Sequence, residues 1–189
     1  MKKAASLLLL ALLTPTLQGC FPVVAAGVGA GTLMASDRRT SGAYVEDEGI
    51  ENKATSLVKK EYDKSVHVNI TSFNRHVLIT GEVPTAAAKT DIGRLAASVE
   101  NVKGVTNELT VGMQSSVSAR SNDALITSNV KTRFIGDNRF HANDVKVITE
   151  ANVVYLMGLV YRKEGDAAAE IASESKGVER VVKVFEYMD

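Results

Sequence analysis

Hydrophobic and polar positions alternate along the chain with two different periods. Between residues 46 and 62 the apolar residues recur at every third or fourth position, which predicts a helix that buries one face: Ile50, Ala54, Leu57, Val58 and Tyr62. The strict alternation that follows, at Val66, Val68 and Ile70, predicts a half-buried strand. A polar connection at 73–76 then leads to a second apolar run, Val77–Val83, so these two strands are expected to form a hairpin.

The same order of elements is completed and then repeated. Pro84-Thr85 opens a helix whose apolar positions share one face, and Val105–Val111 follows as a strand. A second copy is expected as a helix at Asp123–Gly136, strands at Val145–Thr149 and Val153–Val160, a helix at Glu164–Ser173 and a strand at Val178–Tyr187. The pattern predicts an α+β protein with two αββαβ domains, 46–112 and 123–189, joined by a polar linker at 113–122. In each domain, two helices should cover one face of a three-stranded mixed sheet.

Four glycines are expected to be structural and to occupy equivalent places in the two copies. Gly81 is matched with Gly158, and Gly104 is matched with Gly177 through a shared Lys-Gly-Val. Gly81 and Gly158 lie inside strands, where glycine indicates a bulge or a close backbone approach. Because 23 positions separate Gly81 from Gly104 but 19 separate Gly158 from Gly177, an element of the first copy should be about one helical turn longer.

The N-terminus carries a different signal. Lys2 and Lys3 precede an apolar run at Leu7–Leu13, and the only cysteine, Cys20, ends the motif Leu-Gln-Gly-Cys. A single cysteine can be an apolar filler, a reactive thiol, half of an intermolecular disulfide or a modification site, but this layout is that of a secretory signal. An ordinary secretory signal with a nearby cysteine is the alternative to a modification site.

The Leu-x-Gly-Cys motif resembles the lipobox of bacterial lipoproteins. The resemblance implies a signal peptide at 1–19, a diacylglyceryl group on the Cys20 thiol, an N-acyl group on the new N-terminus and a lipidated tether at 20–45. It also implies the outer membrane, with the folded domains in the periplasm, because Phe21 rather than Asp follows the cysteine. Arg38 and Arg39, in the tether, are expected either to touch lipid head groups or to be solvated.

Composition excludes several function classes. Without residues 1–19 the chain has 20 basic and 22 acidic residues, so no general basic surface exists for nucleic acid. The three histidines, His67, His76 and His141, show no catalytic or metal-binding spacing. The acidic run Glu46–Glu48 is interpreted as a helix N-terminus. We therefore expect no enzyme, no metal and no cofactor other than the covalent lipid.

The first helix of the second copy carries apolar residues outside its predicted core stripe. At about 100° per residue, Ile126, Val130 and Phe134 form the stripe, whereas Leu125 and Ile135 fall outside it. They lie on the side that carries polar and basic residues. This face is either a shallow membrane contact, with Arg133 and Arg139 as candidates for phosphate binding, or a surface on which Leu125 packs against the first copy or the linker.

The repeated αββαβ pattern, with the closest matches at 122–127 and 155–160, resembles BON domains. Two such domains behind a lipobox resemble the division- and outer-membrane-stress-associated lipid-binding lipoproteins. The resemblance implies a non-enzymatic protein that binds anionic phospholipid, phosphatidylglycerol or cardiolipin, through its second domain. It also implies support of outer-membrane integrity and a presence at division sites. The residues expected to bind phospholipid are Leu125, Asn129, Lys131, Thr132, Arg133 and Ile135. The alternative is an adaptor that binds outer-membrane assembly or cell-division proteins.

Overall fold

The computed structural model describes residues 38–189. The expectations for the signal peptide at 1–19, for Cys20 and for most of the tether lie outside the described residues. Residues 36–189 form one compact unit, which contains both copies of the repeat.

The first domain has the predicted order of elements. They are helix α3 (Ser41–Tyr62), strands β1 (His67–Phe73) and β2 (His76–Val83), helix α4 (Ala86–Ala97) and strands β3 (Gly104–Asn107) and β4 (Thr110–Val111). β1 pairs with β2 in an antiparallel hairpin, and β3 and β4 both run parallel to β2. The single strand expected at 105–111 is therefore interrupted, because the side chain of Leu109 turns into the core.

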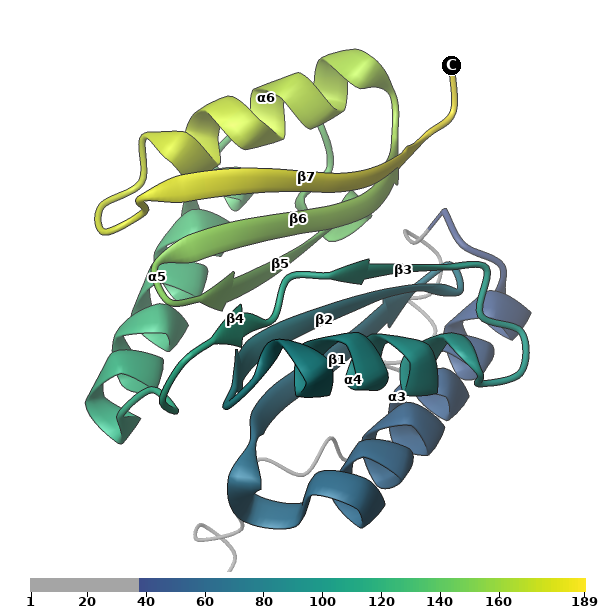
Figure 1. Ribbon diagram of the computed structural model, residues 1–189. Coiled ribbons are helices and arrows are strands. Elements are labelled where there is room, and N and C mark those ends of the chain that lie inside the picture. Colours follow the sequence, from purple (N-terminus) through teal and green to yellow (C-terminus); the bar gives the residue numbers. More distant parts are fainter. Residues whose placement is uncertain (1–37) are drawn as a thin grey trace, which may run out of the picture. The chain divides into compact units, whose positions relative to one another are not determined.

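The second domain repeats this arrangement without the interruption. Its elements are helix α5 (Val117–Ile135), strands β5 (Val145–Glu150) and β6 (Val153–Val160), helix α6 (Arg162–Ser173) and strand β7 (Arg180–Tyr187). β5 and β6 form an antiparallel hairpin, and β7 runs parallel to β6. Figure 1 shows that the helices of each domain cover one face of its mixed sheet, which confirms the predicted fold class.

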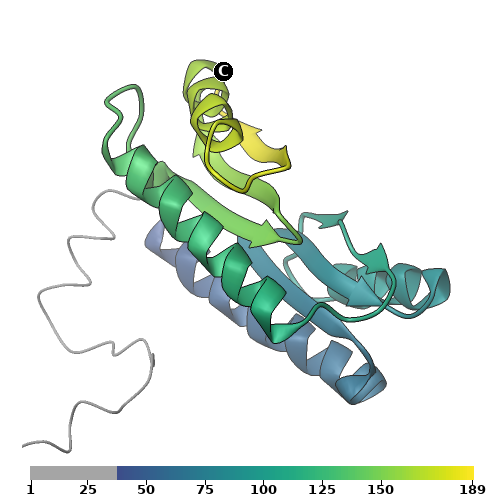
Figure 2. The same ribbon diagram turned by 90° about the vertical axis from the view of Figure 1, so that its left-hand side faces the viewer.

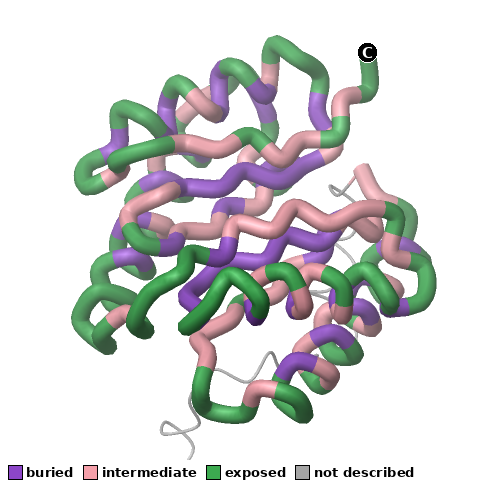
Figure 3. The backbone as a smooth tube through the Cα atoms, in the orientation of Figure 1, coloured by how far each residue is buried: buried purple, intermediate pink, exposed green. Residues whose placement is uncertain are grey.

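Each domain has its own hydrophobic core between its sheet and its two helices. In the first domain Ile50, Val58 and Ile92 from the helices meet Val77 and Ile79 of β2. In the second domain Ile126, Val130 and Phe134 of α5 meet Val154 and Leu156 of β6. The stripe predicted from periodicity is thus the stripe that is buried. Figure 3 shows that the buried residues concentrate on the central strands and on the inner sides of the helices.

The sheet faces that carry no helices pack against each other. A third apolar cluster contains Phe73 and Leu78 of the first domain together with Tyr155 and Met157 of the second. All four side chains are at most 6% exposed. Alternation along a strand places successive side chains on opposite faces, so one set of residues fills each domain's core and the other set fills the contact between domains.

Both long helices begin earlier than the sequence pattern indicates. α3 begins at Ser41, where the hydroxyl of Thr40 accepts the N–H of Ala43 at 3.1 Å, so residues 41–45 of the expected tether are helical. α5 begins at Val117, where the hydroxyl of Ser116 accepts the N–H of Ala119 at 3.2 Å, so more than half of the expected linker is helical. The apolar pattern missed both starts because each helix begins at a capping hydroxyl, and the first residues after the cap show no apolar periodicity.

The glycine alignment of Gly104 with Gly177 is wrong. α4 and α6 have 12 residues each, so no element is a turn longer in the first copy. The sheet register pairs Gly104 with His76 and Arg180 with Val153, which makes Gly104 the counterpart of Arg180. Gly177, with a φ of 89°, corresponds to Asn101, with a φ of 69°. The shared Lys-Gly-Val therefore falls at different places in the two domains.

Gly81 and Gly158 both lie where another strand comes close. A Cβ at Gly81 would be 2.1 Å from the carbonyl oxygen of His67, and its φ of 116° suits glycine alone. A Cβ at Gly158 would be 2.4 Å from the carbonyl oxygen of Asp144. Across residues 38–189 no helix combines the length and the apolar character that crossing a bilayer requires.

The candidate lipid-contacting face of helix α5

α5 lies along the outside of the second domain, and Figure 2 shows it running across the face of the molecule turned toward the viewer. Its inner side is fixed by Ile126, Val130 and Phe134, which are at most 3% exposed. Phe134 also meets Phe140 edge to face, with 5.0 Å between the ring centroids. The helix is therefore held rigidly by one stripe, and its opposite side faces solvent.

Apolar side chains project from this solvent side. Leu125 is 71% exposed and Ile135 is 77% exposed. Leu125 thus does not pack against the first domain or the linker; the contact between domains is made by the sheets instead. Val117, also 77% exposed, adds a third apolar residue at the start of α5. The sequence pattern missed Val117 because the helix was expected to begin at Asp123.

α5 itself contributes no exposed acidic group to this side. Asn129, Lys131 and Thr132 are exposed, as expected. Of the four charged residues in α5, three are basic, and the one acidic residue, Asp123, is 5% exposed. A helix that presents apolar and basic residues without exposed carboxylates suits the head-group region of an anionic bilayer.

Two of the expected phosphate ligands are bound within the protein. The guanidinium of Arg133 donates to the carbonyl oxygen of Ile171 at 2.9 Å, to the hydroxyl of Ser175 at 3.1 Å and to Glu174 at 3.0 Å. Arg133 therefore joins α5 to the end of α6.

Arg139 is bound in the same way. It pairs with Asp137 at 3.0 Å and with Glu170 at 2.8 Å, and these carboxylates raise its pKa. Lys131 is consequently the best-placed cation on the exposed side of α5.

The corresponding helix of the first domain carries no apolar residue at the places of Leu125 and Ile135. α3 and α5 align with an offset of 76 residues, which matches Ile50 to Ile126. Gly49 then stands in the place of Leu125, and Lys59 stands in the place of Ile135. The apolar residues at these two places therefore belong to α5, whereas α3 exposes Tyr44 and Val45 near its start.

A groove of about 410 Å³ separates the start of α3 from the end of α5. Tyr44 and Ile135 line it, together with the basic residues Arg39 and Lys131 and the acidic residues Asp47, Glu48 and Glu51. Tyr44 is 42% exposed. An aromatic residue of the first domain thus lies beside the apolar residues of α5, a combination common where proteins meet head groups.

The two tether arginines are neither solvated nor available to lipid. Arg38 pairs with Glu164 at 2.6 Å and with Asp144 at 3.0 Å, and it donates to the carbonyl oxygen of Leu159. Arg39 pairs with Asp47 at 2.8 Å, and its guanidinium lies 4.0 Å from the centre of the Phe73 ring. These contacts fix the point at which the described chain enters the folded unit, beside the groove and the C-terminal end of α5.

Comparisons with known proteins agree with this architecture. The family model described as "BON domain" matches residues 46–113 and 122–189, so the chain belongs to the BON-domain family and carries two copies of the domain. The predicted family is confirmed.

Three relatives span most of the chain. It is 41% identical to "Outer membrane lipoprotein DolP" of Haemophilus influenzae, over 92% of this chain and 91% of that protein. It is 34% identical to "21 kDa hemolysin" of Actinobacillus pleuropneumoniae, over 80% of this chain and 79% of that one. It is also 29% identical to "Osmotically-inducible protein Y" of Escherichia coli, over 80% of this chain and 78% of that protein.

Proposed function

We propose that the chain is an outer-membrane lipoprotein, anchored through Cys20, whose second BON domain binds anionic phospholipid through α5. The folded domains lie in the periplasm and support the integrity of the outer membrane, including at division sites. The protein is not an enzyme. The observation that carries this proposal is the pair Leu125 and Ile135, exposed on a helix whose only acidic residue is buried.

The anchor and the apolar face can act together. Eighteen positions separate Cys20 from Arg38, which allows a reach of at most about 60 Å even in a fully extended chain. Arg38 is held beside the groove that Ile135 lines, so an acylated Cys20 keeps the folded unit within that reach of the bilayer. The tethered helix then needs only weak intrinsic affinity for lipid, because the anchor raises its effective concentration at the surface.

Insertion of α5 has a simple physical basis. Leu125, Ile135 and Val117 exchange water for acyl chains, and a fully buried aliphatic side chain contributes about 1.5–3 kcal/mol. Lys131 adds an attraction to anionic head groups of about 1 kcal/mol near the surface. Asn129 and Thr132 offer hydrogen-bonding groups to head groups at the same level. The name of the Haemophilus influenzae relative, an outer membrane lipoprotein, supports the same location for this chain.

The test is flotation of the unacylated segment 21–189 with vesicles that contain phosphatidylglycerol or cardiolipin, and with neutral vesicles. We expect binding to anionic vesicles at low salt that weakens as ionic strength rises. The variant Leu125→Glu should lower the fraction bound by about tenfold or more, because it places a charge where an aliphatic group would enter the bilayer.

The first domain provides a matched control. Gly49→Glu places the same carboxylate at the equivalent site of α3, where an added Cβ meets no atom within 4 Å. This variant should float like the wild type. Absence of flotation at low salt, or equal loss in both variants, would refute binding through α5. Attachment would then rest on Cys20, and the adaptor for outer-membrane assembly or division proteins would become the better account.

A further inference from the structure

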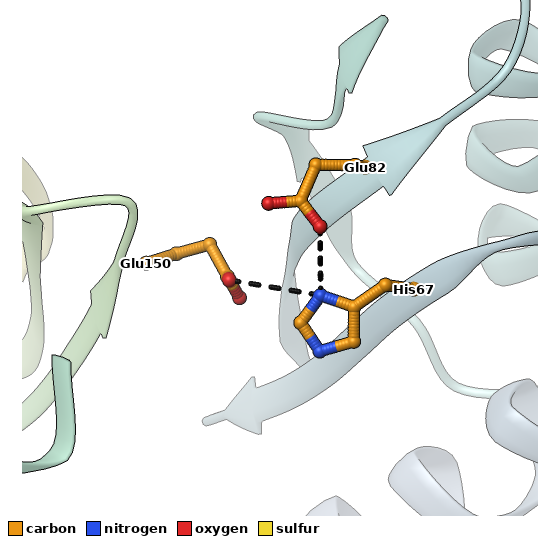
Figure 4. A group of neighbouring side chains, drawn as sticks. All are labelled: His67, Glu82 and Glu150. Atoms are coloured by element: carbon orange, nitrogen blue, oxygen red, sulfur yellow. Dashed lines mark hydrogen bonds and ion pairs between the residues drawn. The ribbon is translucent and has the colours of Figure 1, made fainter. Parts of the chain in front are cut away.

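Three ionisable side chains from three strands meet between the two domains. Figure 4 shows His67 of β1 and Glu82 of β2, from the first domain, facing Glu150 of β5, from the second. The Nδ1 atom of His67 lies 2.8 Å from Oε2 of Glu82 and 3.7 Å from Oε1 of Glu150. One possible ligand atom from each residue lies within 4.8 Å of the other two.

The cluster combines burial with an excess of negative charge. Glu82 and Glu150 are each 7% exposed, and even a protonated His67 balances only one of the two carboxylates. Burial raises the pKa of Glu150, and the carboxylates of Glu82 and Asp123 raise it further; the amide of Asn69 and the imidazole of His67 act in the opposite direction. A bound divalent cation would remove the repulsion between the two carboxylates.

Surrounding donors hold the carboxylates in place. The amide of Asn69 donates to Oε2 of Glu150 at 2.8 Å, and the hydroxyl of Thr80 donates to the same oxygen at 3.3 Å. The N–H of Ser115 donates to Oε2 of Glu82 at 3.1 Å. Metal-binding carboxylates are commonly oriented by such outer hydrogen bonds.

The repeat shows that the fold does not require these acidic residues. The two hairpins align with an offset of 77 residues, as Gly81 and Gly158 show. Phe73 occupies in the first domain the place that Glu150 has in the second, and Leu159 occupies in the second domain the place of Glu82. Both counterparts belong to the apolar contact between the sheets. The sheets therefore accept apolar side chains at these places.

We propose that His67, Glu82 and Glu150 bind one Zn²⁺ ion that joins the two BON domains. An imidazole nitrogen with carboxylate oxygens is a donor set that Zn²⁺ uses, and three protein ligands leave a fourth position for water. Because the ligands come from both domains, binding ties the two hairpins together, and the free energy of binding stabilises the contact between the domains. The spacing of these residues in the sequence, 15 and 68 positions apart, matches no metal-binding motif.

The experiment uses the untagged segment 36–189, which forms one compact unit and lacks the Cys20 thiol. Isothermal titration should give one Zn²⁺ per chain, with Mg²⁺ binding far more weakly. At a hundredfold excess of Zn²⁺ over its dissociation constant, the melting temperature should rise by roughly 5–10 °C. Glu150→Gln and His67→Gln should weaken binding by at least about tenfold.

His76→Gln is the matched control, since it removes a histidine of β2 that bonds to Thr106 rather than to the cluster. This variant should bind Zn²⁺ as the wild type does. The wild-type titration alone decides the case if the cluster variants fold poorly, because absence of saturable binding at micromolar Zn²⁺ overturns the proposal. Binding that Glu150→Gln and His67→Gln leave unchanged, in protein that melts cooperatively, overturns it as well.

Discussion

Asp47 and Asp123, 76 residues apart, hold the hairpin turns of the two domains in the same way. The carboxylate of Asp47 accepts the N–H groups of Asn74 and Arg75 at 2.8 and 2.7 Å. The carboxylate of Asp123 accepts the corresponding N–H groups of Ala151 and Asn152 at 3.0 and 2.9 Å. All four turn residues have positive φ, as a two-residue type I′ turn requires, although none of them is glycine. In each domain, a buried carboxylate from the long helix thus holds a turn that needs two positive φ angles and contains no glycine.

Replacing Asp47 with Ala should destabilise the protein strongly. The variant leaves the two turn N–H groups without their acceptor, and it also removes the acceptor of the Ser72 hydroxyl and one partner of Arg39. We expect the free energy of unfolding to fall by roughly 2–4 kcal/mol in urea titrations. Glu48→Ala, at the exposed neighbouring position, should change it by less than about 0.5 kcal/mol. Similar values for the two variants would contradict the role of Asp47.

Gly81→Ala should be among the most damaging substitutions in the first domain. The new Cβ would lie 2.1 Å from the carbonyl oxygen of His67, on a residue whose φ is 116°. We expect a loss of at least about 3 kcal/mol of stability, seen as a lower melting temperature or as insoluble protein. Gly112→Ala is the control, because nothing lies within 4 Å of its added Cβ. A Gly81→Ala protein as stable as this control would show that the strands can separate to admit the methyl group.

Arg38→Ala should loosen the junction between the chain entry and the second domain. Arg38, which precedes α3, pairs with Glu164 and Asp144 of the second domain and donates to the carbonyl oxygen of Leu159. We expect a loss of roughly 1–2 kcal/mol, with faster amide hydrogen exchange in the first turn of α3. Arg94→Ala breaks an exposed pair with Asp91 and should change stability far less, because exposed ion pairs contribute little. Unchanged exchange at the start of α3 would indicate that Arg38 does not hold the junction.

His76 should make stability depend on pH below neutrality. Burial lowers its pKa below the ordinary value of 6.5, with a smaller opposing effect from Glu186. The unfolded chain therefore binds a proton more readily than the folded one, so stability falls as pH drops through about 6.5 and the loss is complete below the folded pKa. His76→Gln lacks this contribution, and its urea midpoint should fall less than that of the wild type between pH 7.5 and pH 5. Parallel pH profiles would contradict a lowered pKa.

The elements themselves could be predicted from the sequence because each depends on local periodicity. Ile126, Val130 and Phe134 recur at helical spacing, and the same stripe is buried in α5. The alternation in β1 and the glycine inside β2 likewise depend on residues close together in the chain. The same angular argument placed Leu125 and Ile135 off the core stripe, but it left open whether Leu125 is exposed or packs against the first copy or the linker. The helix starts were missed because capping by Thr40 and Ser116 has no apolar signal.

A short sequence match between the two copies led to one wrong alignment. Lys-Gly-Val recurs around Gly104 and Gly177, but the sheet register places these glycines at different points of the two domains. The offset of 76 between Ile50 and Ile126 was the better guide. Applied to Asp47 it leads directly to Asp123, whereas the local acidic run suggested a helix N-terminus that in fact lies at Ser41.

The amino-acid sequence by itself determined the αββαβ repeat, its two cores and the apolar side of α5, because these depend on the spacing of residues within single elements. Only the tertiary structure decided what covers the second face of each sheet. Alternation shows that a strand has two sides, but it does not show that Leu78 of one domain meets Met157 of the other. His67, Glu82 and Glu150 come together for the same reason, since contacts between distant strands are set by how two folded domains pack and not by any local pattern.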